Sequence, residues 1–192
     1  MAVNLSKGQK VDLTKSNPGM TRIRVGLGWD VNKYDGGSQF DLDATAFCLN
    51  SSGKTNSEKD FIFYNNKSNA NGSIVSSGDN QSGEGAGDDE TLSINLAAVP
   101  ADTHKVAFCI TIHDAGARNQ NFGQVANAYV RVINEDSGVE LIRYDLGEDF
   151  SVETAVVVGE LYRHNGEWKF SAVGSGYQNG LSGLCIDFGI QT

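Results

Sequence analysis

The sequence has few cysteines and no apolar run long enough to cross a membrane. Among its 192 residues, the three cysteines Cys48, Cys109 and Cys185 are far apart and stand between apolar residues. Free cysteine usually behaves as a small buried hydrophobe, and no CxxC or Cys/His spacing indicates a zinc site. A membrane span needs about 20 apolar residues, so we do not expect an integral membrane protein.

Basic residues are scarce as well. The chain carries 15 Lys and Arg against 24 Asp and Glu, a net charge of -9. This balance disfavours binding to nucleic acid or to anionic lipid. It is compatible with a protein that attracts cations, although surplus acid also serves solubility alone. The opening MAVNLSKGQKVDL lacks the apolar stretch of a secretory signal, which predicts a cytoplasmic protein, and the length predicts one domain over residues 1–192.

Long amphipathic helices are hard to find, and alternation of apolar and polar residues dominates instead. Such alternation is typical of strands with one buried face. It occurs in residues 22–29, 91–96, 130–132 and 168–172.

Two further segments, 105–112 and 155–161, are apolar on both faces, which predicts central strands. Asn165-Gly166 favours a hairpin turn, because type I′ turns need positive φ at both central residues. Short helices are expected near 180–190 and 117–125. Together these patterns predict a mainly all-β fold, a β-sandwich of two sheets with one or two short helices.

Motifs for catalysis are missing. No P-loop, dinucleotide-binding or GxSxG spacing is complete. His113-Asp114 could supply a base and its orienting acid, but no nucleophile is marked, and such a histidine is more often structural. We therefore expect no enzymatic activity.

Acidic residues form two groups. Asp41 and Asp43 stand two apart on a predicted strand, so their side chains share a face with Cα atoms roughly 7 Å apart, and they repel one another. The second group lies in the glycine-rich stretch 78–90, which has no Lys or Arg. Its members are Asp79, Glu84, Asp88, Asp89 and Glu90.

A hard cation would offset this repulsion. Calcium accepts six to eight oxygen ligands in flexible geometry, and Asn65, Asn66 and Asn80 add neutral oxygens nearby. Magnesium keeps more of its waters, and the spacing is not that of an EF-hand. A calcium site and a solvated acidic loop both remain open on this pattern.

The sequence resembles the TerD family of tellurium-resistance and stress-response proteins. The matching segments include VGLGWD, FDLDA, FIFYNN, GDNQSGEG, GDDE, TIHDA, RYDLGEDFSVETA and GELYRHNGEWKF, and they cover nearly the whole chain. The resemblance implies a β-sandwich with two neighbouring calcium sites at one end. The implied metal ligands are Asp30, Asp41, Asp43, Asn65, Asn66, Asp79, Asn80, Asp88, Asp89 and Glu90. Ala86 departs from the family, which often has an acid there.

Two functional hypotheses follow. The first is a non-enzymatic, calcium-binding stress protein involved in tellurite resistance, with paralogous stress proteins as candidate partners. The alternative is a metal-dependent enzyme, or a protein that binds a cyclic nucleotide or phosphate, using the same acidic site.

Overall fold

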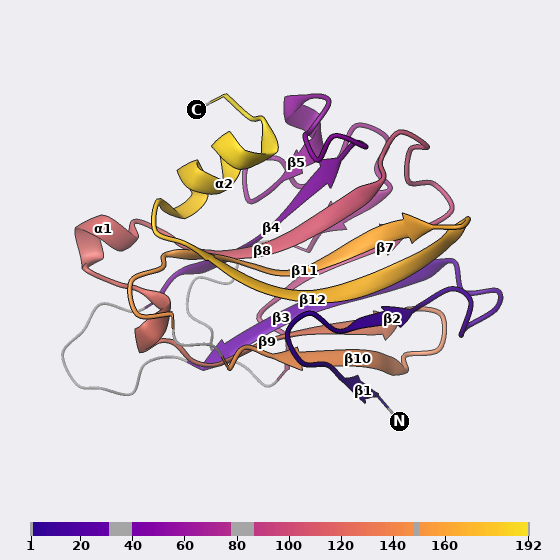
Figure 1. The fold of residues 1–192 in the computed structure, drawn as a ribbon, viewed down its shortest axis with the longest axis horizontal. Helices are drawn as coiled ribbons and strands as arrows, with labels where there is room; N and C mark the ends of the chain where they lie inside the picture. The colour runs from indigo at the N-terminus through magenta and orange to yellow at the C-terminus, as the bar shows by residue number, and fades with distance from the viewer. Residues whose placement is uncertain (1, 31–39, 78–86, 148–149, 192) are drawn as a thin grey trace.

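The structure is a computed structural model that describes residues 2–30, 40–77, 87–147 and 150–191. Its strands form two six-stranded sheets, as predicted (Figure 1). Sheet A has the order β1 (Val3–Asn4), β10 (Glu140–Asp145), β9 (Ala126–Asn134), β3 (Arg22–Asp30), β7 (Glu90–Asn95) and β6 (Ile74–Ser76). Sheet B has the order β2 (Lys10–Asp12), β12 (Glu167–Tyr177), β11 (Ala155–His164), β8 (Lys105–Ile112), β4 (Leu42–Leu49) and β5 (Phe61–Ile62).

The alternating segments are the strands of one-sided burial that the pattern predicts. In β3, for example, Ile23, Val25, Leu27 and Trp29 are buried in the core between the sheets. The two segments that are apolar on both faces, β8 and β11, are the central pair of sheet B. Both faces of sheet B are covered, because a second apolar cluster lies on its outer side.

The predicted hairpin joins β11 to β12, with His164 opposite Glu167. Asn165 has φ 53° and Gly166 has φ 80°. Both central residues therefore have the positive φ that the Asn-Gly pair favours.

Helix is a minor part of the described chain. Helix α2 (Gly180–Phe188) confirms the expectation near 180–190 and packs Leu184 and Cys185 onto the outer face of sheet B. The segment near 117–125 holds only α1 (Ala115–Arg118) and a 3-10 turn, Phe122–Gln124. A second 3-10 turn covers Glu58–Asp60.

The three cysteines are free and buried, as expected. Cys48 lies in the core between the sheets, and Cys109 and Cys185 lie in the outer cluster. Burial, with a smaller effect of the Asp60 charge, raises the pKa of the Cys48 thiol to about 12. Among the described residues, no helix has the length and apolar character of a membrane span.

Candidate metal centre

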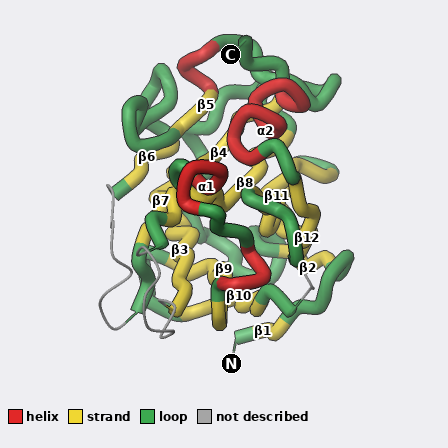
Figure 2. The backbone as a smooth tube through the Cα atoms, turned by 90° about the vertical axis from the view of Figure 1, so that its left-hand side faces the viewer, coloured by secondary structure: helices red, strands yellow, loops and turns green. Residues whose placement is uncertain are grey.

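The end of β3 and the starts of β4 and β7 lie at one end of the sandwich, which faces the viewer in Figure 2. Asp30 ends β3, Asp43 is the second residue of β4, and Glu90 begins β7. Residue Leu27 of β3 pairs with Glu90, and Asp43 pairs with Thr111 near the end of β8. The register of both sheets therefore places these strand ends together.

On sheet B, Asp41 and Asp43 meet His113. The Asp43 side chain is buried, with its residue 7% exposed, and one of its oxygens lies 3.8 Å from Nδ1 of His113. The backbone N–H of His113 donates to the carbonyl oxygen of Asp41 at 2.8 Å. Arg118 of α1 approaches the Asp41 carboxylate at 3.9 Å. Asp43 and His113 thus line a polar hollow of about 460 Å³.

The His113 imidazole does not have the geometry of a catalytic base held by an acid. Its two nitrogens lie 3.8 Å from Asp43 and 3.6 Å from Asp114, longer than hydrogen bonds. Of the residues that the structure describes, those lining the hollow beside it include no Lys or Arg. That chemistry disfavours a phosphate ligand there.

On sheet A, Asp89 has like-charged neighbours. One Asp89 oxygen accepts the backbone N–H of Trp29 at 2.9 Å. Burial raises the pKa of Asp89, and the charges of Asp88 and Asp30 raise it further, while the Trp29 N–H opposes them. Asp30 itself accepts a hydrogen bond from the Asn127 side chain at 2.6 Å. An extra cation beside Asp30 and Asp89 would remove this penalty.

Asp88 is held differently. Its carboxylate lies 2.7 Å from Nε of Arg131 and accepts the Tyr129 hydroxyl at 3.1 Å. Gly26 makes room for it, since a Cβ at position 26 would lie 2.1 Å from an Asp88 oxygen. Burial, followed by the Asp88 charge, raises the pKa of Tyr129 to about 12. Asp88 therefore already has a cation on the outer face of sheet A.

Glu90 connects the two sheets. Its side chain points into the core, where the residue is 3% exposed, and one of its oxygens accepts the Ala44 N–H at 2.6 Å. Because Glu90 belongs to β7 and Ala44 to β4, this hydrogen bond ties the acids of sheet A to those of sheet B.

The two asparagines lie in the turn that follows β5. The Asn66 amide donates to the Phe61 carbonyl at 2.6 Å, and Asn65 lines a groove beside α2. The predicted ligands Asp79 and Asn80 lie outside the described residues, as do Glu84 and Ala86.

The described donors suit calcium in type, although they do not form a complete shell. Within the described ranges, no three His, Cys, Asp or Glu side chains are close enough to hold a metal ion. The acids instead form two groups, Asp41 with Asp43 and Asp30 with Asp89, and Glu90 lies between the sheets. Nearly all donors are oxygens, which calcium prefers.

Sequence reasoning missed Arg131 and Tyr129 as partners of Asp88. The alternation in β9 places Arg131 on the outer face, and the pairing of Gly26 with both Thr91 and Arg131 brings it next to Asp88. An outward-facing arginine opposite a glycine would therefore have indicated a partner for Asp88, but this can be recognised only when the strand order is known.

A comparison with protein families matches residues 1–188 to the TerD domain. The chain belongs to the TerD domain family. It is 63% identical over 191 residues to general stress protein 16U of Bacillus subtilis, covering 100% of this chain and 99% of the relative. It is 56% identical over 190 residues to tellurium resistance protein TerD of Serratia marcescens, covering 99% and 98%.

Two solved structures share the fold. A crystal structure of a protein of unknown function superposes with a TM-score of 0.73 at 24% identity, covering 91% of this chain and 99% of that one. A Streptomyces coelicolor homologue of the telluride resistance protein TerD superposes with a TM-score of 0.66 at 23% identity, covering 85% and 94%.

Proposed function

We propose that this TerD-domain protein binds calcium at the acidic end of the sandwich and acts as a non-enzymatic stress protein in resistance to tellurium. The observation that carries the proposal is the gathering of Asp30, Asp43 and Glu90 at one end of the sandwich, where Glu90 joins the two sheets by accepting the Ala44 N–H. Beside them, burial and then the charges of Asp88 and Asp30 raise the pKa of Asp89. Such a group is stabilised by a bound cation. The stress role rests on the names of the relatives, general stress protein 16U and tellurium resistance protein TerD.

The ligands divide between the two sheets. Asp30 and Asp89 would bind from sheet A, and Asp41 and Asp43 from sheet B. Glu90 would hold the two halves in register through its hydrogen bond to Ala44. Bound calcium supplies positive charge and fixed coordination, and it thereby orders the carboxylates that otherwise repel one another.

Asp88 has a structural role rather than that of a calcium ligand in this proposal. Its Oδ1 atom receives hydrogen bonds from Arg131 and from Tyr129. Calcium bound through that oxygen would compete with the Nε atom of Arg131, whose other carboxylate partner is Glu140 at 2.9 Å from Nη1. We therefore propose that Asp88 anchors the start of β7 while Asp89 and Glu90 serve the site.

The partners we propose are paralogous TerD-domain proteins. Three Bacillus subtilis proteins, general stress protein 16U, YceE and stress response protein SCP2, are related to this chain at 63%, 56% and 38% identity.

Calorimetric titration with calcium, in the presence and absence of excess magnesium, tests the binding. Asp41→Asn/Asp43→Asn should weaken calcium binding at least about tenfold, which corresponds to about 1.4 kcal/mol. The matched control is Asp102→Asn/Asp136→Asn, which removes the same charge at the opposite end and should leave the affinity unchanged. Equal affinities in the two double variants would show that Asp41 and Asp43 are not ligands.

The stress role needs its own test. A host that lacks its TerD-domain proteins should grow on tellurite when it carries the wild-type chain. Growth should fail with the Asp41→Asn/Asp43→Asn variant at equal protein level and persist with the control variant. Equal growth with both variants would separate tellurium resistance from calcium.

A further inference from the structure

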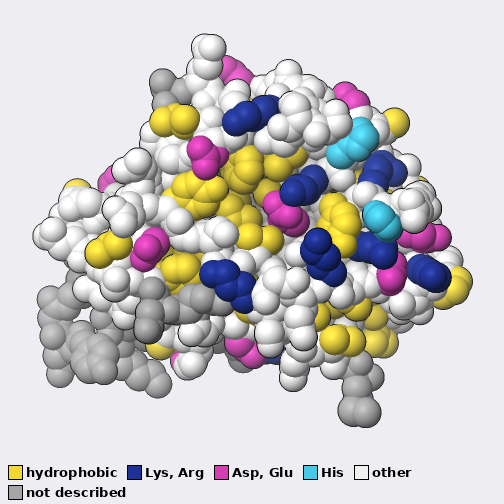
Figure 3. Space-filling model, in the orientation of Figure 1, with side chains coloured by type: hydrophobic (Ala, Val, Ile, Leu, Met, Phe, Trp, Pro, Cys, Tyr) yellow, Lys and Arg dark blue, Asp and Glu magenta, His cyan; other side chains and the backbone are white. Residues whose placement is uncertain are grey.

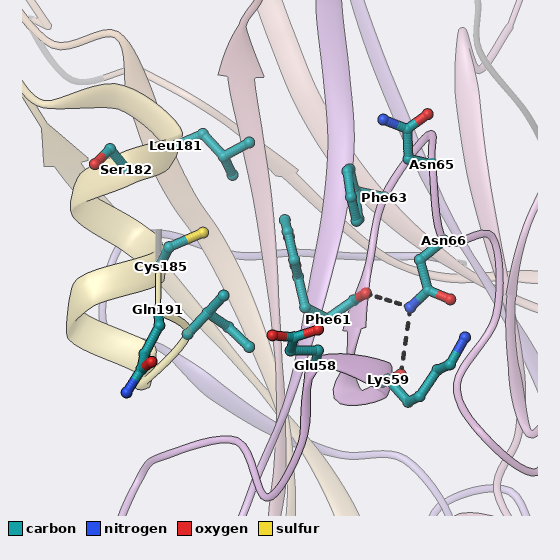
Figure 4. A pocket seen from close by; sticks show the side chains of 11 residues that line it. Glu58, Lys59, Phe61, Phe63, Asn65, Asn66, Leu181, Ser182, Cys185 and Gln191 are labelled. Carbon is teal, nitrogen blue, oxygen red and sulfur yellow. Dashed lines mark hydrogen bonds between the residues drawn. The ribbon is translucent and has the colours of Figure 1, made fainter.

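A groove of about 600 Å³ lies on the outer side of sheet B, between α2 and the segment around β5 (Figure 4). Its volume falls within the roughly 300–1,000 Å³ of small-molecule sites. Its apolar wall consists of Phe61, Phe63, Leu181, Cys185 and Ile190. The described acids of the candidate metal centre do not line it.

The aromatic wall is rigid. The Phe61 ring stacks between Phe47 and Phe63, with ring centroids 4.5 and 4.3 Å apart and interplanar angles of 11° and 5°. Phe47 is fully buried, so the three-ring stack is anchored in the outer cluster. The Asn66 amide also holds the turn by donating to the Phe61 carbonyl. A wall that is already ordered loses little entropy when a ligand binds.

The polar groups at the rim favour a positively charged ligand. Glu58 contributes a carboxylate beside Phe61 on the side that faces α2, whereas the Lys59 ammonium extends away from the aromatic wall (Figure 4). The lining residues include no arginine, and the remaining polar ones, among them Ser182 and Gln191, are neutral. The net charge of -9 further disfavours anions.

Two other uses of the groove are disfavoured by its chemistry. Burial raises the pKa of the Cys185 thiol, so the thiol stays neutral and is a poor nucleophile. Among the described residues that line the groove, Glu58 is the one carboxylate, and a single carboxylate is too few to bind a metal ion. The groove therefore suits reversible binding.

We propose that this groove binds a flat aromatic cation, with the ring against Phe63 and the edge of Phe61 and the positive group beside Glu58. Aromatic rings stack with an offset or pack edge to face, and a ligand cation gains further from nearby aromatic rings. The wall thus selects a planar apolar body, and Glu58 selects its charge.

Two probes of the same shape and opposite charge test the proposal: 2-naphthamidine and 2-naphthoate. Each is titrated into the full chain in EDTA, so that the result is independent of calcium and of the proposed function. Binding is followed by amide shifts in ¹H–¹⁵N spectra. We expect saturable shifts at Phe61, Phe63 and Cys185, with a dissociation constant for naphthamidine at least about tenfold below that for naphthoate.

Variants locate the site. Ser182 is exposed on α2 and lines the groove, so Ser182→Trp should fill the groove and weaken naphthamidine binding at least about tenfold. Its matched control is Ile186→Trp on the same helix, where Ile186 is 64% exposed and does not line the groove. The control should bind as the wild type does. Glu58→Gln should reduce the preference for the cation.

Several results would overturn the proposal. Equal affinity for the two probes would remove the role of Glu58, and unchanged binding in Ser182→Trp would place the site elsewhere. Amide shifts at residues outside the groove in the wild-type chain would also place the site elsewhere. This result does not depend on whether Ser182→Trp folds. A dimer that naphthamidine disrupts would instead assign the groove to a second copy of the chain.

Discussion

The two ends of the sandwich differ in how their polar and charged side chains are paired. At the end opposite the acids, Arg163 lies over the Trp168 ring at 4.2 Å and donates to the carbonyl oxygens of Val99, Pro100 and Thr103. At the acidic end, burial and, to a smaller extent, the neighbouring charges of Asp88 and Asp30 raise the pKa of Asp89. On the face drawn in Figure 3, Lys, Arg and His side chains gather on the right-hand half, away from the acidic end. At one end internal partners satisfy the polar groups, and at the other end carboxylates lie near one another.

The largest change is expected at the end opposite the acids. Arg163→Met should lower the free energy of unfolding by about 3 kcal/mol, because three carbonyl oxygens lose a charged donor and Trp168 loses its cation. Chemical denaturation with and without calcium should give the same loss. Lys10→Met is the control, since Lys10 is exposed and lies 5.8 Å from the Tyr162 ring; it should cost less than about 0.5 kcal/mol. A loss in Arg163→Met that calcium reverses would contradict the independence of the two ends.

Calcium binding at the acidic end should change the free energy of unfolding by a slightly smaller amount than Arg163→Met. At a calcium concentration one hundred times the dissociation constant, ligand binding to the folded state alone adds about 2.7 kcal/mol. For a chain of this size, that raises the melting temperature by roughly 5–10 °C. Calorimetry in EDTA and in calcium measures the shift, with equimolar magnesium as the control. A melting temperature that does not change would count against a calcium site.

The pair Arg131–Asp88 combines features of both ends, because Asp88 lies at the acidic end and already has an internal cation, Arg131. Arg131→Met should cost about 2 kcal/mol, between the values for exposed and buried pairs, since the Arg131 side chain is 26% exposed and Asp88 is 6% exposed. Adding Asp88→Asn should recover part of that loss, which a double-mutant cycle measures. If calcium alone compensated fully for Arg131→Met, Asp88 would have become a metal ligand.

Much of the scaffold was predictable from local pattern. Alternation identified β3 and β7, burial on both faces identified the central strands β8 and β11, and Asn165-Gly166 identified the hairpin. These features depend on neighbouring residues in the sequence, which explains the success.

The arrangement of the site was less accessible. Asp88 and Asp89 are adjacent in sequence, yet Asp88 pairs with Arg131, which is 43 residues away, while Asp89 accepts from Trp29. Which acid meets a cation is decided by the pairing of Gly26 with both Thr91 and Arg131. That pairing depends on strand order. The groove likewise depends on how α2 packs against sheet B.

The smallest expected effect concerns Asp89 and depends on pH. Its pKa in the folded chain is raised, chiefly by burial, above the ordinary value of about 3.9. The folded state therefore favours the protonated form, and this contribution to stability is complete below the ordinary value. It is lost as the pH rises through the raised pKa of the folded chain. At neutral pH the calcium-depleted protein is therefore destabilised by the ionised Asp89 carboxylate.

Asp89→Asn removes this charge while keeping an oxygen that can accept the Trp29 N–H. The calcium-depleted variant should equal the wild type near pH 3 and exceed it by less than about 1 kcal/mol at pH 7, a value kept small because Asp89 is only partly buried. Unfolding in denaturant across this pH range measures the difference. With calcium present, the wild type should be more stable than the variant, because Asp89→Asn removes a charged ligand. A stability gain that is the same at pH 3 and pH 7 would trace to packing, and the repulsion at the acidic end would then have another source.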